Sequence, residues 1–343
     1  MRLFSYRNKL RLRSVLLTLL IVLAVLAVLA IGIFIYLQRY IVYTPTGARL
    51  DFSTHVKASP KADSAAPPNP EFVIESSASG ASETAKAPAA AKLSGFFVTS
   101  DMLADTAAVE KALAPTGSTM SVLLDVKSGF GNFFYPSALS GVSTSDSLDV
   151  NAVGELIRTL AARSDVYLIA RVPAFRDSNF ALANQDCGLP LSSGALWMDS
   201  DSCYWLDPAS DKVSSYLESI ATELQGLGFD EVVFSDFCFP DSGNIAYRGD
   251  KTAAVSEAAR RLSANLADSG IAVSFAPADA ALTPYAKRLY QEADDGGGVQ
   301  ALVSGLSLTD PASQLAFLTA SHDTRFNDYG VLRPAIETGK TAS

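Results

Sequence analysis

The sequence predicts an α/β protein, a (β/α)8-type TIM barrel, over residues 93–343. Short apolar runs rich in β-formers alternate with helical periodicity, which is typical of repeated βα units and a parallel sheet. The segment also has the length of such a barrel, about 250 residues. Its strands are apolar on both faces, as in Ser121-Val122-Leu123-Leu124. A doubly wound open sheet is the alternative.

The expected elements follow the chain in order. Seven strands are predicted, at 95–99, 120–126, 166–172, 231–235, 271–275, 301–306 and 331–336. Apolar residues at helical spacing predict helices over 150–160 and 213–227. No eighth strand is recognisable, so the barrel is expected to be incomplete at the C-terminus unless the short patch Phe72-Val73-Ile74 closes it.

Residues 15–37 are predicted to form one transmembrane helix. These 23 residues carry no charge, and at helical rise they extend about 34 Å, enough to cross a bilayer. A buried core helix, the alternative, would show a polar stripe. The basic tail, residues 1–14, predicts a cytoplasmic N-terminus and an extracytoplasmic main domain at the cell membrane. The apolar stretch continues past the cleavage-like Val28-Leu29-Ala30, so we expect an uncleaved signal anchor.

Residues 38–92 are predicted to be a disordered linker, because most of this segment is rich in Ala, Ser and Pro and can bury little. The whole chain has net charge −9, with 36 acidic and 27 basic residues. Five of the basic residues lie in the N-terminal tail, so the rest of the chain is still more acidic. This balance argues against nucleic acid as a partner and favours neutral or cationic ligands.

Metal and nucleotide chemistry have little support in the sequence. The only histidines are His55 and His322, so no metal site is predicted. Neither common glycine-rich phosphate loop is present, and no nucleotide or other cofactor is expected. Outside the cytoplasm, Cys187 and Cys203 could form a disulfide. The alternative is three reduced, buried thiols, Cys238 included.

Polar residues where the predicted strands end are the candidate site, because a TIM barrel carries its function on that rim. Aromatic rings beside carboxylates suit a sugar, whose C–H faces pack on rings while its hydroxyls form hydrogen bonds. A glycan or polysaccharide is therefore the expected ligand, with Asp125 and Asp236 as the catalytic pair. The expected substrate-binding residues are Lys127, Tyr135, Arg171, Trp197, Trp205, Asp207, Ser235 and Asp279.

Structural roles are the alternative for several of these residues. Asp207 could N-cap the helix that follows it, and Arg171 could simply pair with Asp125 at the barrel mouth. Trp197 and Trp205 could form a hydrophobic cluster under a long loop.

At these positions the chain resembles a glycoside-hydrolase-like TIM-barrel family, related to alpha-amylase-type barrels and formerly a domain of unknown function. The motifs that carry the resemblance are Leu124-Asp125-Val126-Lys127, Tyr135-Pro136-Ser137, Ile169-Ala170-Arg171-Val172 with Phe175 and Asp177, Trp205-Leu206-Asp207-Pro208, Gly228-Phe229-Asp230-Glu231 and Phe239-Pro240. The resemblance implies a barrel that acts on a glycan.

The chain departs from the family where catalysis is expected. The family's fourth strand ends in a pattern like FDYVRFP, whereas Ser235 here stands at the aspartate and Cys238 at the arginine. Ala276 stands where strand five of the family has an aspartate. Side chains alternate along a strand, so Asp236 would face away from the family position unless a bulge rotates it back. The resemblance thus implies either a membrane-anchored hydrolase of a cell-envelope or external glycan, or a degenerate barrel that binds glycans or docks proteins.

Overall fold

The computed structural model describes residues 41–44, 47–50 and 92–336. The chain separates into two units, Met1–Ser79 and Gly80–Ser343. In the first, β1 (Ile41–Thr44) and β2 (Gly47–Leu50) form an antiparallel hairpin, at the start of a segment predicted to have no secondary structure. The predicted transmembrane helix, most of the predicted linker and the Phe72 patch lie outside the described residues. No helix among those described is long and apolar enough to span a membrane.

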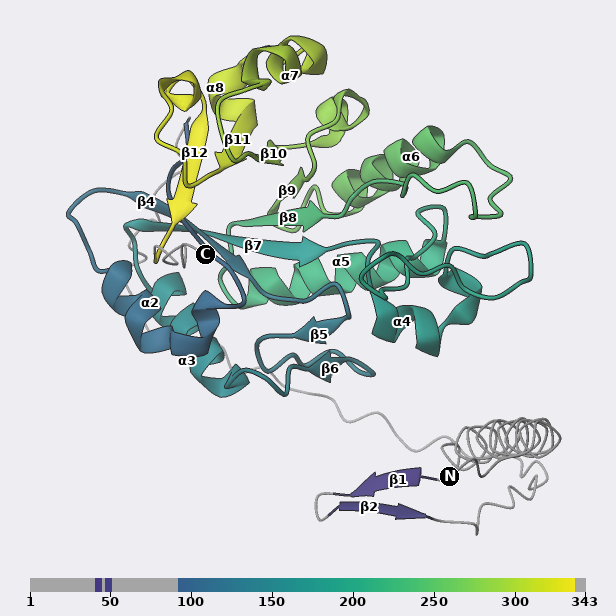
Figure 1. Ribbon diagram of the computed structural model, residues 1–343. Coiled ribbons are helices and arrows are strands. Elements are labelled where there is room, and N and C mark those ends of the chain that lie inside the picture. Colours follow the sequence, from purple (N-terminus) through teal and green to yellow (C-terminus); the bar gives the residue numbers. More distant parts are fainter. Residues whose placement is uncertain (1–40, 45–46, 51–91, 337–343) are drawn as a thin grey trace, which may run out of the picture. The chain divides into compact units, whose positions relative to one another are not determined.

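The second unit is a closed barrel of eight parallel strands (Figure 1). The strands are β3 (Ser94–Val98), β4 (Met120–Asp125), β7 (Val166–Pro173), β8 (Glu231–Ser235), β9 (Ala272–Phe275), β10 (Leu289–Glu292), β11 (Leu315–Leu318) and β12 (Gly330–Pro334). The last strand pairs with the first, with Leu332 opposite Gly95, and this closes the ring. The predicted TIM barrel is confirmed, and the open-sheet alternative is wrong.

Helices cover the outside of the barrel (Figure 1). They are α2 (Thr106–Ala112), α3 (Val150–Ala161), α4 (Ser178–Ala183), α5 (Asp211–Gly226), α6 (Lys251–Asn265), α7 (Val299–Leu306) and α8 (Pro311–Gln314). In α3, Val153, Leu156, Ile157 and Leu160 are buried, which is the apolar stripe that predicts this helix. The long helices α5 and α6 bury similar apolar stripes, whereas the short helix α8 buries no residue.

The sequence prediction was wrong over the last third of the barrel. Residues 301–306 lie in the helix α7 rather than in a strand, because a short apolar run fits either structure. Two strands, β10 and β11, were missed. Along β10 the inward positions are polar, including Tyr290 and Glu292, so no apolar run marks it. With these two strands the barrel closes, so the incomplete barrel expected from the sequence is wrong.

The inside of the barrel has a buried polar floor. Glu231, at the start of β8, accepts hydrogen bonds from Tyr167 (2.9 Å), Ser274 (2.6 Å) and Tyr290 (2.8 Å). It also forms an ion pair with Arg288 at 2.5 Å, and both side chains are almost fully buried. Since a buried charge must be paired and hydrogen-bonded, this network holds four neighbouring strands in one arrangement.

Candidate functional site

The carboxyl ends of the strands surround a cavity of about 570 Å³, here called the cup. Figure 1 shows β7 and β8 pointing toward the side of the barrel that carries α4, and the cup lies on this rim. Strand alternation decides which side chains enter it. Leu123, Ile169 and Val233 face the barrel interior, so the residues two positions later face the same way. The strand-end residues that line the cup are Asp125, Arg171, Ser235, Ala276 and Glu292.

Arg171 joins two carboxylates across the cup. Its guanidinium donates to both oxygens of Asp125, from Nε at 2.5 Å and from Nη2 at 3.0 Å, and Nη1 contacts Glu292. Burial alone would lower the pKa of Arg171, but the Asp125 and Glu292 carboxylates raise it overall, so the arginine keeps its charge. The predicted Arg171–Asp125 pair is confirmed, and it fixes the orientation of Asp125.

Asp236 also lines the cup, although it lies one residue beyond β8. Its φ of 49° is in the left-handed region, which is uncommon for any residue other than glycine. The next residue, Phe237, is buried, and its backbone N–H donates to the Ala276 carbonyl at 2.9 Å. The left-handed turn therefore breaks the strand alternation, with Phe237 in the core and Asp236 at the cavity. The turn thus rotates Asp236 back toward the cup, which the sequence analysis expected only of a bulge.

The Asp236 carboxyl has a perturbed electrostatic environment. Burial raises its pKa, and the positive charges of Arg176, Lys127 and Arg171 oppose the rise only in part. Within the described residues no hydrogen bond or ion pair is formed with this carboxylate. A carboxyl group in such a place retains its proton to a higher pH than an exposed aspartate, which is the property of a general acid.

The other cations of the cup are engaged with the surrounding loops. Lys127 is buried, donates to the Pro173 carbonyl at 2.9 Å and forms an ion pair with Asp177 at 2.9 Å. Arg176 pairs with two carboxylates of the long loop after β7, each at 2.7 Å. Both side chains form walls of the cup and hold the loops in place.

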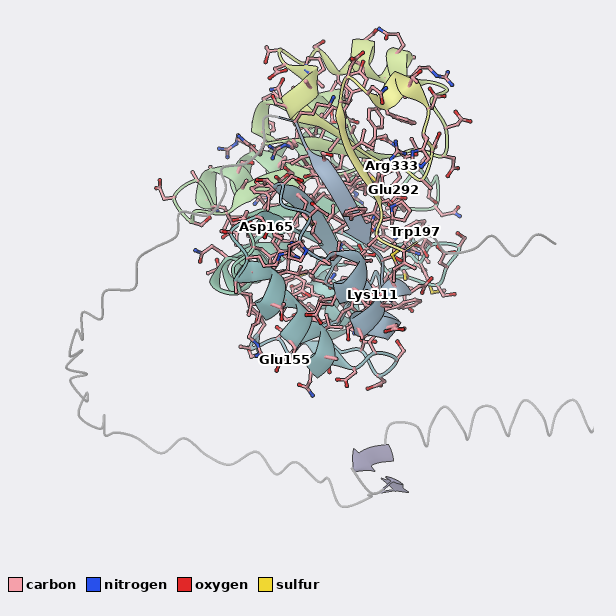
Figure 2. All side chains as sticks on the ribbon, turned by 90° about the vertical axis from the view of Figure 1, so that its left-hand side faces the viewer. Lys111, Glu155, Asp165, Trp197, Glu292 and Arg333 are labelled. Carbon is pink, nitrogen blue, oxygen red and sulfur yellow. The ribbon has the colours of Figure 1, made fainter. Side chains whose placement is uncertain are left out.

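Five predicted binding residues, three aromatic and two acidic, do not reach the cup. Tyr135 is buried on the outside of the barrel and donates to Glu223 at 2.7 Å. Trp205 is 8% exposed, so it cannot be a sugar platform. It packs on Trp197 at 6.3 Å between ring centroids, and neither ring lines the cup. Trp197 and Trp205 are thus better described as a hydrophobic cluster than as a sugar-binding platform. Trp197 is labelled in Figure 2.

The two remaining predicted aspartates act locally. Asp207 accepts from the Ala209 N–H at 2.8 Å in the turn before α5, and the helix itself is capped by Ser210, so the predicted Asp207 cap is wrong. Asp279 caps a short 3-10 helix, Ala280–Tyr285, and lines a different cavity of about 270 Å³.

The cysteines are free thiols in this structure, and Cys187 and Cys203 are both buried. The predicted disulfide is therefore absent, and the alternative of reduced thiols fits. No group of three or more His, Cys, Asp or Glu side chains in the described part of the chain is arranged to hold a metal ion.

The predicted site lacks two charged residues and one exposed aromatic residue that line the cup. Glu292 was missed because its strand was not recognised. Arg176 carried no motif of its own. Phe130 stands in the loop after β4 with 47% of its surface exposed, and its position between Gly129 and Gly131 was the available signal of a tight turn.

An eight-stranded parallel barrel with helices outside it and charged side chains on its carboxyl rim is a TIM barrel, with its candidate site where this fold carries function. Residues 95–285, more than half of the chain, match the family described as "Putative glycosyl hydrolase domain", and the chain belongs to this family.

Solved structures that match part of this chain include a hypothetical protein from Ruminiclostridium thermocellum, with 21% identity and a TM-score of 0.44. The match covers 52% of this chain and 96% of that one. Ega3 from Aspergillus fumigatus, solved with galactosamine, has 14% identity and a TM-score of 0.42, with 68% and 77% covered. An alpha-galactosidase from Geobacillus stearothermophilus has 12% identity and a TM-score of 0.46, with 73% and 40% covered. No curated protein matches the chain.

Proposed function

We propose that the cup is the active site of a glycoside hydrolase that acts on a cell-envelope or external glycan. The observation that supports this most directly is Asp236, a carboxyl group without a hydrogen-bond partner in the described structure, at a buried position beside the cavity and with a raised pKa. The family membership of the chain supports the same chemistry.

Glycoside cleavage uses two carboxyl groups, one that donates a proton to the leaving oxygen and one that acts as nucleophile or base. Asp236 is the proton donor in this proposal, because burial favours its neutral form. Asp125 is the second carboxylate, held in one orientation by Arg171. Glu292 is the alternative for this role, since it contacts the same guanidinium.

Other residues of the cup would bind the sugar. The Ser235 hydroxyl can donate and accept hydrogen bonds beside the acid. Lys127 and Arg171 add positive charge near the glycosidic oxygen, on which negative charge develops as its bond to the sugar breaks.

The test is hydrolysis of a panel of cell-envelope and external polysaccharides by the full-length protein, measured as release of reducing ends. Asp236→Asn should lower turnover by about 10²- to 10⁴-fold, the usual contribution of a general acid, and should leave glycan affinity nearly unchanged. Comparison of Asp125→Asn with Glu292→Gln assigns the second carboxylate. If the unmodified protein cleaves no member of the panel, the hydrolase proposal fails.

A non-catalytic glycan-binding barrel is the second candidate. It is favoured by the Arg171 ion pair, which occupies both oxygens of Asp125, and by Ser235 and Ala276 at the family's carboxylate positions. This candidate predicts glycan affinity without release of reducing ends, and equal affinity for the Asp236→Asn protein.

We also propose that residues 15–37 anchor the protein in the cell membrane, with the N-terminus in the cytoplasm and the barrel outside. The uncharged stretch and the basic tail before it support this proposal. The protein should stay in the membrane fraction after alkaline extraction, and protease added to intact cells should digest the barrel but not an N-terminal tag. Recovery of the full chain in the soluble fraction would contradict the anchor.

A further inference from the structure

A second cavity of about 440 Å³ adjoins the cup on the side of β3 and β4. The two cavities share four lining residues, Ser100, Ser128, Phe130 and Phe134. Each cavity by itself falls in the size range of ligand sites. The second one, here called the side cleft, is built from the segments after β3, after β4 and around β6 (Ser143–Thr144).

Phe130 stands at the boundary of the cup and the side cleft, and its backbone is tightly held. It lies at the tip of a turn in which Gly131 N–H donates to Ser128 O at 3.0 Å. Its own carbonyl accepts from the Asn179 N–H at 3.0 Å. Gly131 has φ 92°, and a side chain there would come within 2.1 Å of Asp177. A half-exposed ring on such a fixed turn is preorganised to stack against a ligand.

The lining of the side cleft differs in charge from that of the cup. Its polar groups are mainly hydroxyls and an amide, from Ser128, Asn132, Ser145 and Ser147, and Asp101 is the charged side chain among its lining residues. The cup contains three acidic and three basic side chains. Neutral donors and acceptors beside an aromatic ring fit sugar hydroxyls and C–H faces, without the groups needed for bond cleavage.

We propose that the side cleft is a second sugar-binding subsite, so that the ligand is a neutral linear glycan chain spanning both cavities. Phe130 stacks on the sugar unit at their boundary, and the hydroxyls of the side cleft bind the unit beyond it. This inference deepens the proposed function, since the cup is where the chain is held for cleavage. It goes further by requiring a ligand of several units rather than a single terminal sugar.

The test measures binding, so it does not depend on turnover. Full-length Asp236→Asn protein is titrated calorimetrically with cello-, chito-, xylo- and malto-oligosaccharides of one to six units. Affinity for at least one series should rise with chain length. Adding Phe130→Ala should weaken the longest bound oligomer by about tenfold, near the upper limit for a stacked aromatic contact, and should leave the shortest bound member within twofold. Leu182→Ala, which removes another exposed apolar side chain outside both cavities, is the matched control.

Binding that does not increase with length, a loss of less than threefold with Phe130→Ala, an equal loss with Leu182→Ala, or no binding by any series would each overturn the subsite. Failure of the hydrolase proposal has a different signature: unmodified protein that binds longer oligomers through Phe130 and releases no reducing ends. Melting temperatures of the variants confirm that each is folded.

Discussion

Replacing Asp236 by asparagine should stabilise the protein while it strongly lowers turnover. Burial raises the pKa of this carboxyl in the folded state, so the folded protein binds the proton more tightly than the unfolded chain does. The stability that this provides is complete below the unfolded pKa and is lost as the pH rises through the folded pKa. Above the folded-state pKa the buried negative charge therefore opposes folding, and a neutral side chain of the same shape removes that cost.

The size of the stability gain depends on what else the Asp236→Asn substitution changes. Asn adopts the left-handed backbone at least as readily as Asp, so the φ of 49° adds no penalty. No hydrogen bond of the carboxylate within the described structure is lost. We expect a gain of about 0.5–2 kcal/mol, the usual size of one stabilising substitution, and a melting temperature higher by roughly 1–8 °C for a domain of this size. Turnover should fall by about 10²- to 10⁴-fold.

The assay is thermal unfolding of the unmodified and Asp236→Asn proteins between pH 4 and pH 8, beside turnover measured at the same pH values. The stability difference should grow as the pH rises. The turnover of the unmodified protein should fall at its alkaline limit, because the acid must carry its proton. Asp294→Asn, at an exposed loop position, is the control and should change neither quantity. An Asp236→Asn protein that is less stable than the unmodified one throughout this range would refute the reasoning, because Asp236 would then be a structural residue.

Three further predictions concern the framework. Glu231→Gln should lower the free energy of unfolding by about 3–5 kcal/mol in a denaturant titration, because it removes the negative charge that pairs with the buried Arg288. A loss under 1 kcal/mol would contradict the role of this network. Gly131→Ala should weaken oligosaccharide binding as strongly as loss of the Phe130 ring, because the new methyl group collides with Asp177 and displaces the turn; unchanged affinity would mean that the turn does not position the ring. Since Cys187 and Cys203 are free, a reducing agent should leave the melting temperature unchanged, and a drop of several degrees would reveal a disulfide.

The strands that the sequence marks most clearly are long runs whose inward and outward side chains are both apolar; β11 is apolar too, but it has only four residues and was missed. In β4 and β7 almost every residue is buried, and the runs 120–126 and 166–172 mark them clearly. The strand β10 is different, because its inward side chains serve the polar floor and the cup, and polarity hides a strand from any hydrophobic pattern. The polar side chains of β10 are therefore the reason why this strand, and Glu292 on it, was not predicted.

The site residues that could be predicted are those whose orientation follows from the alternation of side chains along a strand. Asp125 and Arg171 lie opposite each other on β4 and β7, and their position on the rim follows from the strand ends alone. The predicted sugar-binding roles of Trp205 and Tyr135 were wrong because both side chains are buried. Burial of an aromatic side chain in a loop depends on packing between segments distant in sequence. Trp205 donates to Asp199 at 2.8 Å under its own loop, and no local pattern reports such a contact.

Asp236 combines two unfavourable features in one residue, and this bears on whether the barrel still performs chemistry. A left-handed backbone at a residue other than glycine is unfavourable by up to about 1–2 kcal/mol, less for aspartate, and the carboxyl is also desolvated. Glycine would relieve the first and asparagine the second, so a barrel that needed only to fold or bind a glycan would gain from losing this aspartate. Strain and a raised pKa that coincide beside a cavity are typical of catalytic residues. These features support the proposal that the position after Ser235 supplies the carboxyl group that the family has at Ser235. Turnover of the Asp236→Asn protein, compared with that of the unmodified protein, tests it.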